Sequence, residues 1–80
     1  MHYVYLLESE RVAGERYVGI TSDLKKRLAE HNAGKSPHTA KFRPWSLVTY
    51  VAFSDPAKAR AFERYIKSGS GHAFARRRLW

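Results

Sequence analysis

The sequence lacks cysteine, has few acidic residues and contains no long apolar run. Without cysteine, disulfide bonds and thiolate metal sites are excluded, so the fold must depend on packing alone. The longest apolar stretch, residues 47–53, is far shorter than the roughly 20 residues that cross a bilayer. The N-terminal Met-His-Tyr-Val-Tyr also differs from the basic-then-apolar pattern of a signal peptide. We therefore expect a cytoplasmic protein with no membrane association.

Basic residues are abundant: 15 Lys and Arg stand against 7 Asp and Glu, for a formal net charge of +8. On so small a protein this excess predicts a polyanionic partner, with nucleic acid ahead of an anionic membrane. A chain of 80 residues buries only about 60% of its unfolded surface, so residues 1–80 are expected to form one domain with a modest core. The hydrophobic content of 44% is sufficient for a globular fold.

The first 20 residues alternate in a way that predicts a β-hairpin with a wide loop. We place Tyr5 opposite Tyr17 and Gly19 opposite Tyr3, with all four side chains on one face of the sheet. Alternatively, the two facing tyrosines have only a structural role, as an ordinary cross-strand aromatic pair.

A helix should follow the hairpin. Thr21 or Ser22 would cap it and Asp23 would lie in its first turn, where the helix dipole favours an anion. Ala33 and Gly34 would end it.

The second half of the chain predicts a basic loop over residues 34–44, a strand over 45–53 and a second long helix. Asp55 would cap that helix, with Pro56 at its first position and the buried side marked by Phe62 and Ile66. Gly69 and Gly71 would end it, and Ser70 would cap a short final helix. The order ββαβαα predicts an α+β domain, with helices flanking a small, mainly antiparallel three-stranded sheet.

Two polar side chains lie beside the apolar stripe of the first helix. At about 100° per residue, Leu24 and Leu28 define that stripe, His31 projects almost along it, and Arg27 lies at its edge. Taken singly, Arg27 could lay its methylene groups over the core, and His31 could be a hydrogen-bonded histidine at the core boundary. Their combination with other residues favours a functional role.

The deciding pattern is the order of several motifs. Tyr3-Val4-Tyr5 is followed by Tyr17-Val18-Gly19, then by Arg27, by His31 one turn later, and by Glu63 in the next long helix. This pattern resembles the GIY-YIG nuclease superfamily, and the match is closest to its short stand-alone bacterial members. The resemblance covers nearly the whole chain.

The resemblance implies a metal-dependent phosphodiesterase with one role for each matched residue. Tyr5 would be the general base, and Tyr17 would orient the attacking water or a phosphate oxygen. Arg27 would stabilise the transition state, and His31 would assist proton transfer. Glu63 would hold one divalent cation, Mg²⁺ or Mn²⁺, although its alternative role is a surface ion pair with Lys67.

Nucleic acid, most of all DNA, is the expected partner. The residues expected to contact it are a glycine beside the substrate backbone and two groups of basic side chains: Gly19, Lys35, Lys41, Arg43, Arg76, Arg77 and Arg78. The other histidines (His2, His38 and His72) are expected at the surface, with His38 a second candidate for the active site.

The expected activity is endonucleolytic hydrolysis of DNA, including structured, damaged or single-stranded forms, with low sequence specificity. The alternative is a non-catalytic nucleic-acid-binding module that keeps the fold. Two departures from the family pattern bear on this choice. Tyr3 stands where the family has glycine, and no asparagine follows Glu63, where Ser68 or Ser70 would have to substitute.

Overall fold

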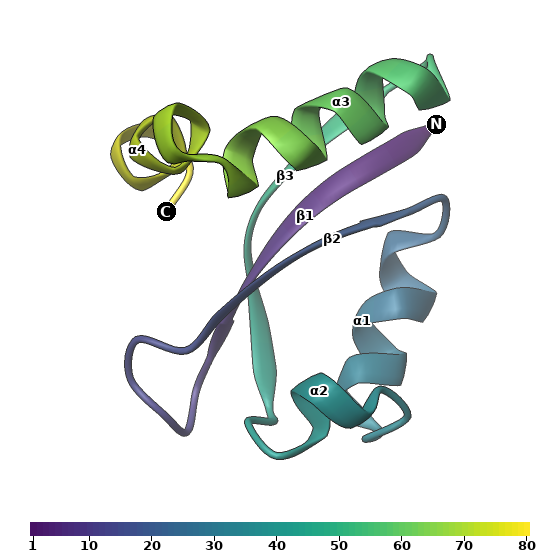
Figure 1. Ribbon diagram of the computed structural model, residues 1–80. Helices are drawn as coiled ribbons and strands as arrows, with labels where there is room; N and C mark the ends of the chain where they lie inside the picture. The colour runs from purple at the N-terminus through teal and green to yellow at the C-terminus, as the bar shows by residue number, and fades with distance from the viewer.

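Three strands form a single antiparallel sheet in the computed structural model, which describes all 80 residues. The strands are β1 (His2–Ser9), β2 (Arg16–Thr21) and β3 (Trp45–Phe53), and β1 lies in the centre of the order β2-β1-β3. Four consecutive residues of β1, Val4 to Leu7, are buried, because helices cover both faces of the sheet (Figure 1).

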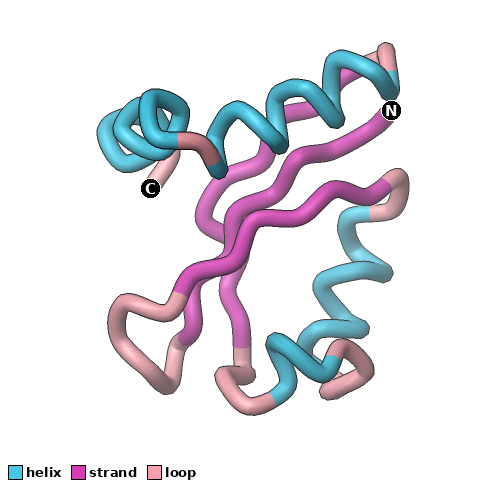
Figure 2. Tube along the Cα trace, in the orientation of Figure 1, coloured by secondary structure: helices cyan, strands magenta, loops and turns pink.

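The helices are α1 (Leu24–Asn32), the one-turn α2 (Pro37–Ala40), α3 (Pro56–Lys67) and α4 (Gly69–Arg78). Helices α1 and α2 lie together at one side of the sheet, and α3 and α4 lie together at the other (Figures 1 and 2). The α+β class and the order ββαβαα of the main elements are confirmed. The addition is α2, which interrupts the segment expected to be a loop. None of the helices has the length and apolar character needed to span a membrane.

The sheet separates two hydrophobic clusters. The α3 cluster combines β1 residues with α3 and α4, and consists of Val4, Leu6, Ala59, Ile66 and Ala75. The tyrosine cluster lies on the opposite face, where Tyr5, Leu7 and Trp45 pack with Tyr17, Leu24 and Leu28, among others. Successive β1 side chains therefore lie in opposite clusters, Val4 and Leu6 in one and Tyr5 and Leu7 in the other, as expected for an alternating strand.

The predicted hairpin register is wrong by two residues. Tyr5 pairs with Gly19, and Tyr17 pairs with Leu7. The wide loop is confirmed and spans residues 10–15. In it, the Ser9 hydroxyl accepts hydrogen bonds from two backbone N–H groups, those of residues 11 and 12, at 3.2 and 3.0 Å. Gly14 completes it with a positive φ of 85°, which glycine adopts readily. A shift of two residues preserves the face on which each side chain lies, so the predicted grouping of the tyrosines survives.

Two predicted helix caps are also wrong. Asp23 is not in the first turn of α1 but is its N-cap, and its side chain accepts a hydrogen bond from the backbone N–H of Lys26 at 3.1 Å. Helix α4 begins at Gly69, with Ser68 rather than Ser70 as its N-cap residue. At Asp55, the carboxylate caps α3 as predicted, through the N–H of Ala57 at 2.9 Å.

The first turn of α4 requires a residue without a side chain where it packs on the end of α3. A Cβ added to the buried Gly71 would overlap the backbone carbonyl of Tyr65, whereas a Cβ added to the neighbouring Gly69 would meet nothing within 4 Å. Backbone atoms cannot rotate away as a flexible side chain can, so α4 packs this closely against the end of α3 only with glycine at position 71.

We expect Gly71→Ala to lower the free energy of unfolding by about 1–3 kcal/mol, the usual cost of overpacking a tight contact. Gly69→Ala is the matched control, and it should be neutral or stabilising by up to about 1 kcal/mol, because it restricts the unfolded chain. Urea denaturation of both variants measures the difference. Equal midpoints would contradict the proposed role of Gly71.

Candidate active site

Tyr5 occupies a buried position that depends on a glycine in the neighbouring strand. Its side chain is only 2% exposed. Gly19 lies directly opposite it in β2, and a Cβ at that position would overlap the hydroxyl end of the Tyr5 ring and lie 2.9 Å from Cε2 of Tyr17. Gly19 therefore makes room for both tyrosines, and its predicted contact with a nucleic acid is not tested by this packing.

A chain of buried hydrogen bonds runs from Tyr5 into α1 and α2. The Tyr5 hydroxyl lies 2.9 Å from Nε2 of His31, and Nδ1 of His31 lies 2.8 Å from Oγ1 of Thr39. His31 and Thr39 are 0% and 1% exposed. Both ring nitrogens of His31 are thus satisfied, and the Tyr5–His31–Thr39 chain connects β1, α1 and α2. The sequence placed His31 at the core boundary, but it is fully buried.

The direction of the hydrogen bonds follows from what Thr39 can donate. Its hydroxyl donates to the carbonyl oxygen of Ser36 at 3.4 Å, so its oxygen accepts from His31. His31 then carries its proton on Nδ1, and Nε2 presents a lone pair to the Tyr5 hydroxyl. In this tautomer, Tyr5 is the donor and His31 the acceptor.

Burial and charge shift the pKa values of this cluster. Burial raises the pKa of Tyr5 above 10.0, and hydrogen bonding to Arg27 offsets part of that rise. Burial lowers the pKa of His31 below 6.5, and the positive charge of Arg27 lowers it further. For Arg27 itself, burial opposes the charge, but hydrogen bonds to Tyr5 and Glu30 outweigh burial and raise its pKa. At neutral pH the cluster therefore holds a neutral tyrosine, a neutral histidine and a permanent cation.

Arg27 and Tyr17 border the same cluster. Nη1 of Arg27 donates to Oε1 of Glu30 at 3.2 Å, and the side chain is 31% exposed, so part of the guanidinium faces solvent. The Tyr17 ring lies 6.2 Å from that of Tyr5 and 5.0 Å from that of His31. The structure therefore brings together four of the five residues predicted to be catalytic.

The fifth residue, Glu63, lies on α3, which packs against the opposite face of the sheet. Its carboxylate forms an ion pair with Nζ of Lys67 one turn later, which is the alternative that the sequence left open. No group of three or more His, Asp or Glu side chains is close enough to enclose a metal ion. One carboxylate of 18% exposure still fits Mg²⁺, which keeps most of its waters and binds through one or two carboxylates plus substrate phosphates.

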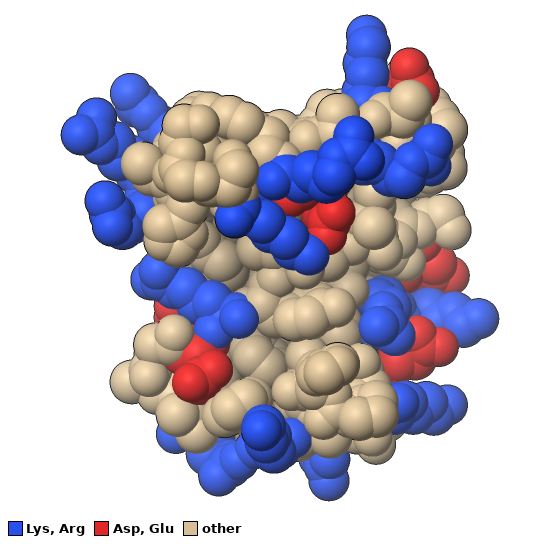
Figure 3. All heavy atoms as spheres, viewed as in Figure 1, with Lys and Arg blue, Asp and Glu red and all other residues tan.

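The basic residues among the predicted nucleic-acid contacts are solvent-exposed but dispersed. The lysines and arginines at 35, 41, 43 and 76–78 are all exposed. Figure 3 shows basic side chains around the margins of one face, with an uncharged centre over β2. His38 and His72 are exposed and His2 is half-buried, none of them in a metal-binding group.

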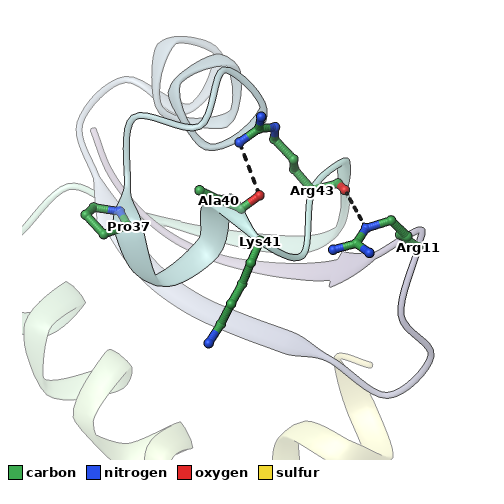
Figure 4. A pocket seen from close by; sticks show the side chains of 5 residues that line it. All are labelled: Arg11, Pro37, Ala40, Lys41 and Arg43. Atoms are coloured by element: carbon green, nitrogen blue, oxygen red, sulfur yellow. Dashed lines mark hydrogen bonds between the residues drawn. The ribbon is translucent and has the colours of Figure 1, made fainter.

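A hollow of about 510 Å³ brings Lys41 and Arg43 together with Arg11, a residue that sequence reasoning missed. Arg43 donates to the carbonyl of Ala40 at 3.2 Å, and Nε of Arg11 donates to the carbonyl of Arg43 at 3.3 Å. Lys41 extends away from the two arginines (Figure 4). Arg11 lies in the hairpin loop, and no sequence signal links it to residues 30 positions away.

Thr39 is the other residue that sequence reasoning missed. It lies in the segment expected to be a loop, and α2 buries it because its carbonyl accepts a hydrogen bond from Nε1 of Trp45 at 2.9 Å. Trp45 is held in turn by Asn32, whose side chain bonds its backbone N–H and carbonyl at 2.6 and 3.1 Å. The only available signal was Pro37 at a position that suits a helix start.

Comparison with known proteins agrees with this geometry. A model of the GIY-YIG catalytic domain matches residues 1–76. The chain belongs to the GIY-YIG family. This membership points to nuclease chemistry on a nucleic acid.

The similar proteins include relatives that carry a UPF0213 name. One from Streptococcus pyogenes serotype M3 is 44% identical over 66 residues, covering 81% of this chain and 70% of the relative. A second, from serotype M5 of the same species, is 42% identical over the same length. The solution NMR structure of the UPF0213 protein BH0048 from Bacillus halodurans is 33% identical, with a TM-score of 0.56, covering 94% of this chain and 79% of that one.

We expect stability to fall below about pH 6.5 because of His31. Its pKa is lowered in the folded state, so as pH falls the unfolded chain binds the proton first. The contribution is fully present above the unfolded pKa and is lost as pH drops toward the folded one, with a slope of up to about 1.4 kcal/mol per pH unit.

Denaturation midpoints of wild type and His31→Gln between neutral and acid pH provide the measurement. The wild type should lose stability faster than the variant as pH decreases. His38→Gln, at an exposed histidine, is the control and should retain the wild-type slope. Parallel curves for wild type and His31→Gln would mean that the folded state does not hold His31 neutral.

Proposed function

We propose that this GIY-YIG protein is a divalent-cation-dependent endonuclease that hydrolyses phosphodiester bonds in DNA with low sequence specificity. The observation that carries the proposal is the buried Tyr5–His31–Thr39 chain, which ends at a phenol beside Arg27. A polar chain of this kind is costly to bury. Packing alone does not require it, since an apolar residue could fill the site of His31.

The Tyr5–His31–Thr39 hydrogen bonds provide a route for a proton. As an attacking water loses its proton to the Tyr5 oxygen, the hydroxyl proton of Tyr5 passes to Nε2 of His31, 2.9 Å away. His31 is neutral at pH 7 because burial lowers its pKa, so Nε2 is free to accept. Thr39 fixes the tautomer by accepting from Nδ1. Tyr5 thus acts without becoming a free phenolate, which its raised pKa would disfavour.

Arg27 and Tyr17 would contact the substrate in this mechanism. The raised pKa of Arg27 keeps it charged at every working pH, and its fork of N–H groups suits the oxygens of a phosphate. It would stabilise the negative charge that develops on the phosphorus oxygens. Tyr17, half-buried beside the Tyr5 and His31 rings, would orient the water or a phosphate oxygen.

Glu63 would hold the divalent cation, which when bound polarises the phosphate and stabilises the leaving oxygen. The ion pair with Lys67 must open or be shared for this to happen. Ion pairs of this kind at a protein surface contribute about 0–1 kcal/mol, so a divalent ion can compete with the lysine.

A non-catalytic nucleic-acid-binding module is the second candidate. The observation in its favour is the Glu63–Lys67 ion pair, together with the absence of a group of three or more His, Asp or Glu side chains that could hold a metal ion. The buried His31 favours the enzyme, because a binding module gains nothing from a proton acceptor behind a tyrosine. Cleavage assays with and without Mg²⁺ distinguish the two.

Tyr5→Phe should reduce the cleavage rate by about 100-fold or more, because it removes the oxygen that transfers the proton and keeps the ring. Wild-type activity should rise from acid toward alkaline pH, with its acid limb below 6.5, where His31 becomes protonated. Tyr50→Phe, at a tyrosine that is 50% exposed, is the matched control and should cleave normally. A loss of less than about tenfold in Tyr5→Phe would exclude Tyr5 as the base.

Glu63→Gln and Arg27→Ala should separate chemistry from binding. Glu63→Gln removes the only carboxylate proposed for Mg²⁺, so cleavage should be nearly lost while DNA affinity stays level or rises. Arg27→Ala should abolish cleavage and also weaken binding, since it deletes a phosphate contact.

Cleavage rate, DNA affinity and melting temperature should be measured for both variants. Lys67 is half-exposed in its ion pair with Glu63, so Glu63→Gln should cost about 1 kcal/mol of stability or less. Wild-type cleavage by Glu63→Gln would refute the metal assignment, and an unfolded variant would make Glu63 a structural residue.

A further inference from the structure

A second hollow, of about 380 Å³, lies between the edge strand β2 and the helices α3 and α4. We call it the β2–α4 groove. Seven side chains line it: Arg16, Tyr17, Val18, Ile66, Lys67, His72 and Trp80. Tyr17 is the one among them assigned a direct role in the mechanism above, and Lys67 enters it through its ion pair with Glu63. The sequence predicted His72 to be an ordinary surface residue.

The lining of the groove combines two kinds of surface. Val18, Ile66 and Trp80 form an apolar part, and the nitrogen-bearing side chains of Arg16, Lys67 and His72 surround it, with no acidic residue in the lining. The guanidinium of Arg16 lies over the Trp80 ring, 4.7 Å from its centroid. Flat aromatic and guanidinium planes stack on nucleobases, and cations bind the adjoining phosphates. A nucleotide presents the same combination.

The groove is continuous with the active site. Tyr17 lines the groove and also packs against Tyr5 and His31, and Lys67 lines it while pairing with Glu63. The uncharged centre in Figure 3 lies over β2, between the basic side chains on the helices above and those on either side. A strand bound across Tyr17 would therefore place the next nucleotide in the groove.

We propose that the β2–α4 groove is a nucleotide subsite that takes one unpaired nucleotide next to the scissile phosphate, with its base against Trp80 and its phosphate at Arg16, Lys67 and His72. This inference rests on the proposed nuclease function and names the substrate class of the same site. A base that enters the groove cannot remain stacked and paired in a duplex. The substrate is therefore single-stranded or locally unpaired nucleic acid.

Arg16 and Lys67 are already paired, with Glu8 at 3.1 Å and with Glu63. The Arg16 pair is about 40% exposed on both sides, and exposed pairs of this kind contribute little to stability. A phosphate can therefore replace the carboxylates as their partner. Without a nucleotide, the stacking of Arg16 on Trp80 shields the ring from water.

Tryptophan fluorescence tests the proposal directly, because the chain has two tryptophans and Trp45 is only 3% exposed. The wild-type protein, with EDTA present to prevent cleavage, is titrated with oligothymidylate, with the same oligomer carrying abasic positions, and with a duplex of equal length. Oligothymidylate should quench the fluorescence and bind at least tenfold more tightly than the duplex. The abasic oligomer should bind more weakly, because it has no base to stack.

Three variants locate the binding. Trp80→Leu keeps an apolar side chain but should weaken single-strand binding by about tenfold or more and abolish the quenching. His72→Ala, at an exposed position where a substitution costs little stability, should weaken single-strand binding about threefold, because it removes a hydrogen-bond donor to the phosphate. Lys58→Ala, at an exposed basic position on α3 outside the groove lining, is the control and should keep both the quenching and the preference for single strands.

Equal affinity for oligothymidylate, the abasic oligomer and the duplex, without quenching, would overturn the subsite. That result, combined with Mg²⁺-dependent cleavage by the wild type, would leave the nuclease proposal intact. Base-dependent quenching without any cleavage would have the reverse meaning: the groove binds nucleotides, and the proposed activity is wrong.

Discussion

The structure around the candidate site depends on one constraint: an imidazole with no solvent exposure must have both of its nitrogens satisfied. His31 meets it through Tyr5 on one side and Thr39 on the other. A buried polar group without a partner costs more than a made hydrogen bond gains, so the positions of β1, α1 and α2 are linked by these two bonds. The short helix α2 is part of this requirement, since it delivers the hydroxyl of Thr39 and is held by Trp45. The same bonds determine the tautomer, so packing and the proposed proton transfer depend on the same contacts.

The two motifs of the hairpin, Tyr3-Val4-Tyr5 and Tyr17-Val18-Gly19, pack together as one unit. Gly19 lies opposite Tyr5, and the absence of a side chain at Gly19 leaves the space that the Tyr5 ring fills. This complementarity explains why a tyrosine and a glycine, neither of which is distinctive alone, identify the fold when they occur at hairpin spacing. It also positions Tyr17 beside Tyr5 through ring contact rather than direct cross-strand pairing.

Periodicity and caps predicted most of the fold, because alternation in β1 and the Asp55-Pro56 start of α3 are local features of the chain. The predictions of the hairpin register and of the start of α4 were wrong, because the register depends on the hydroxyl of Ser9 and the helix start on the backbone contact at Gly71. In the site, Arg27 and His31 could be found from their position beside the Leu24 stripe and from the family pattern. Thr39 could not, because its burial depends on α2, for which Pro37 is the only signal. Arg11 and the lining of the β2–α4 groove could not, because their contacts join segments far apart in the sequence. The pairing of Glu63 with Lys67 was foreseen only as an alternative.

Strand β2 is at the edge of the sheet, so one side of its backbone has no strand partner. Such an edge is a template for pairing with another chain, and here it borders Tyr17 and the hollow beside it. Pairing of two β2 edges would bring two copies together at the surface proposed to receive the substrate. The formal charge of +8 opposes this encounter. A polyanion bound at the proposed site would remove that repulsion by neutralising the charge and would also cover the edge. The protection of this protein against self-association and the access to its site are therefore governed by the same charges.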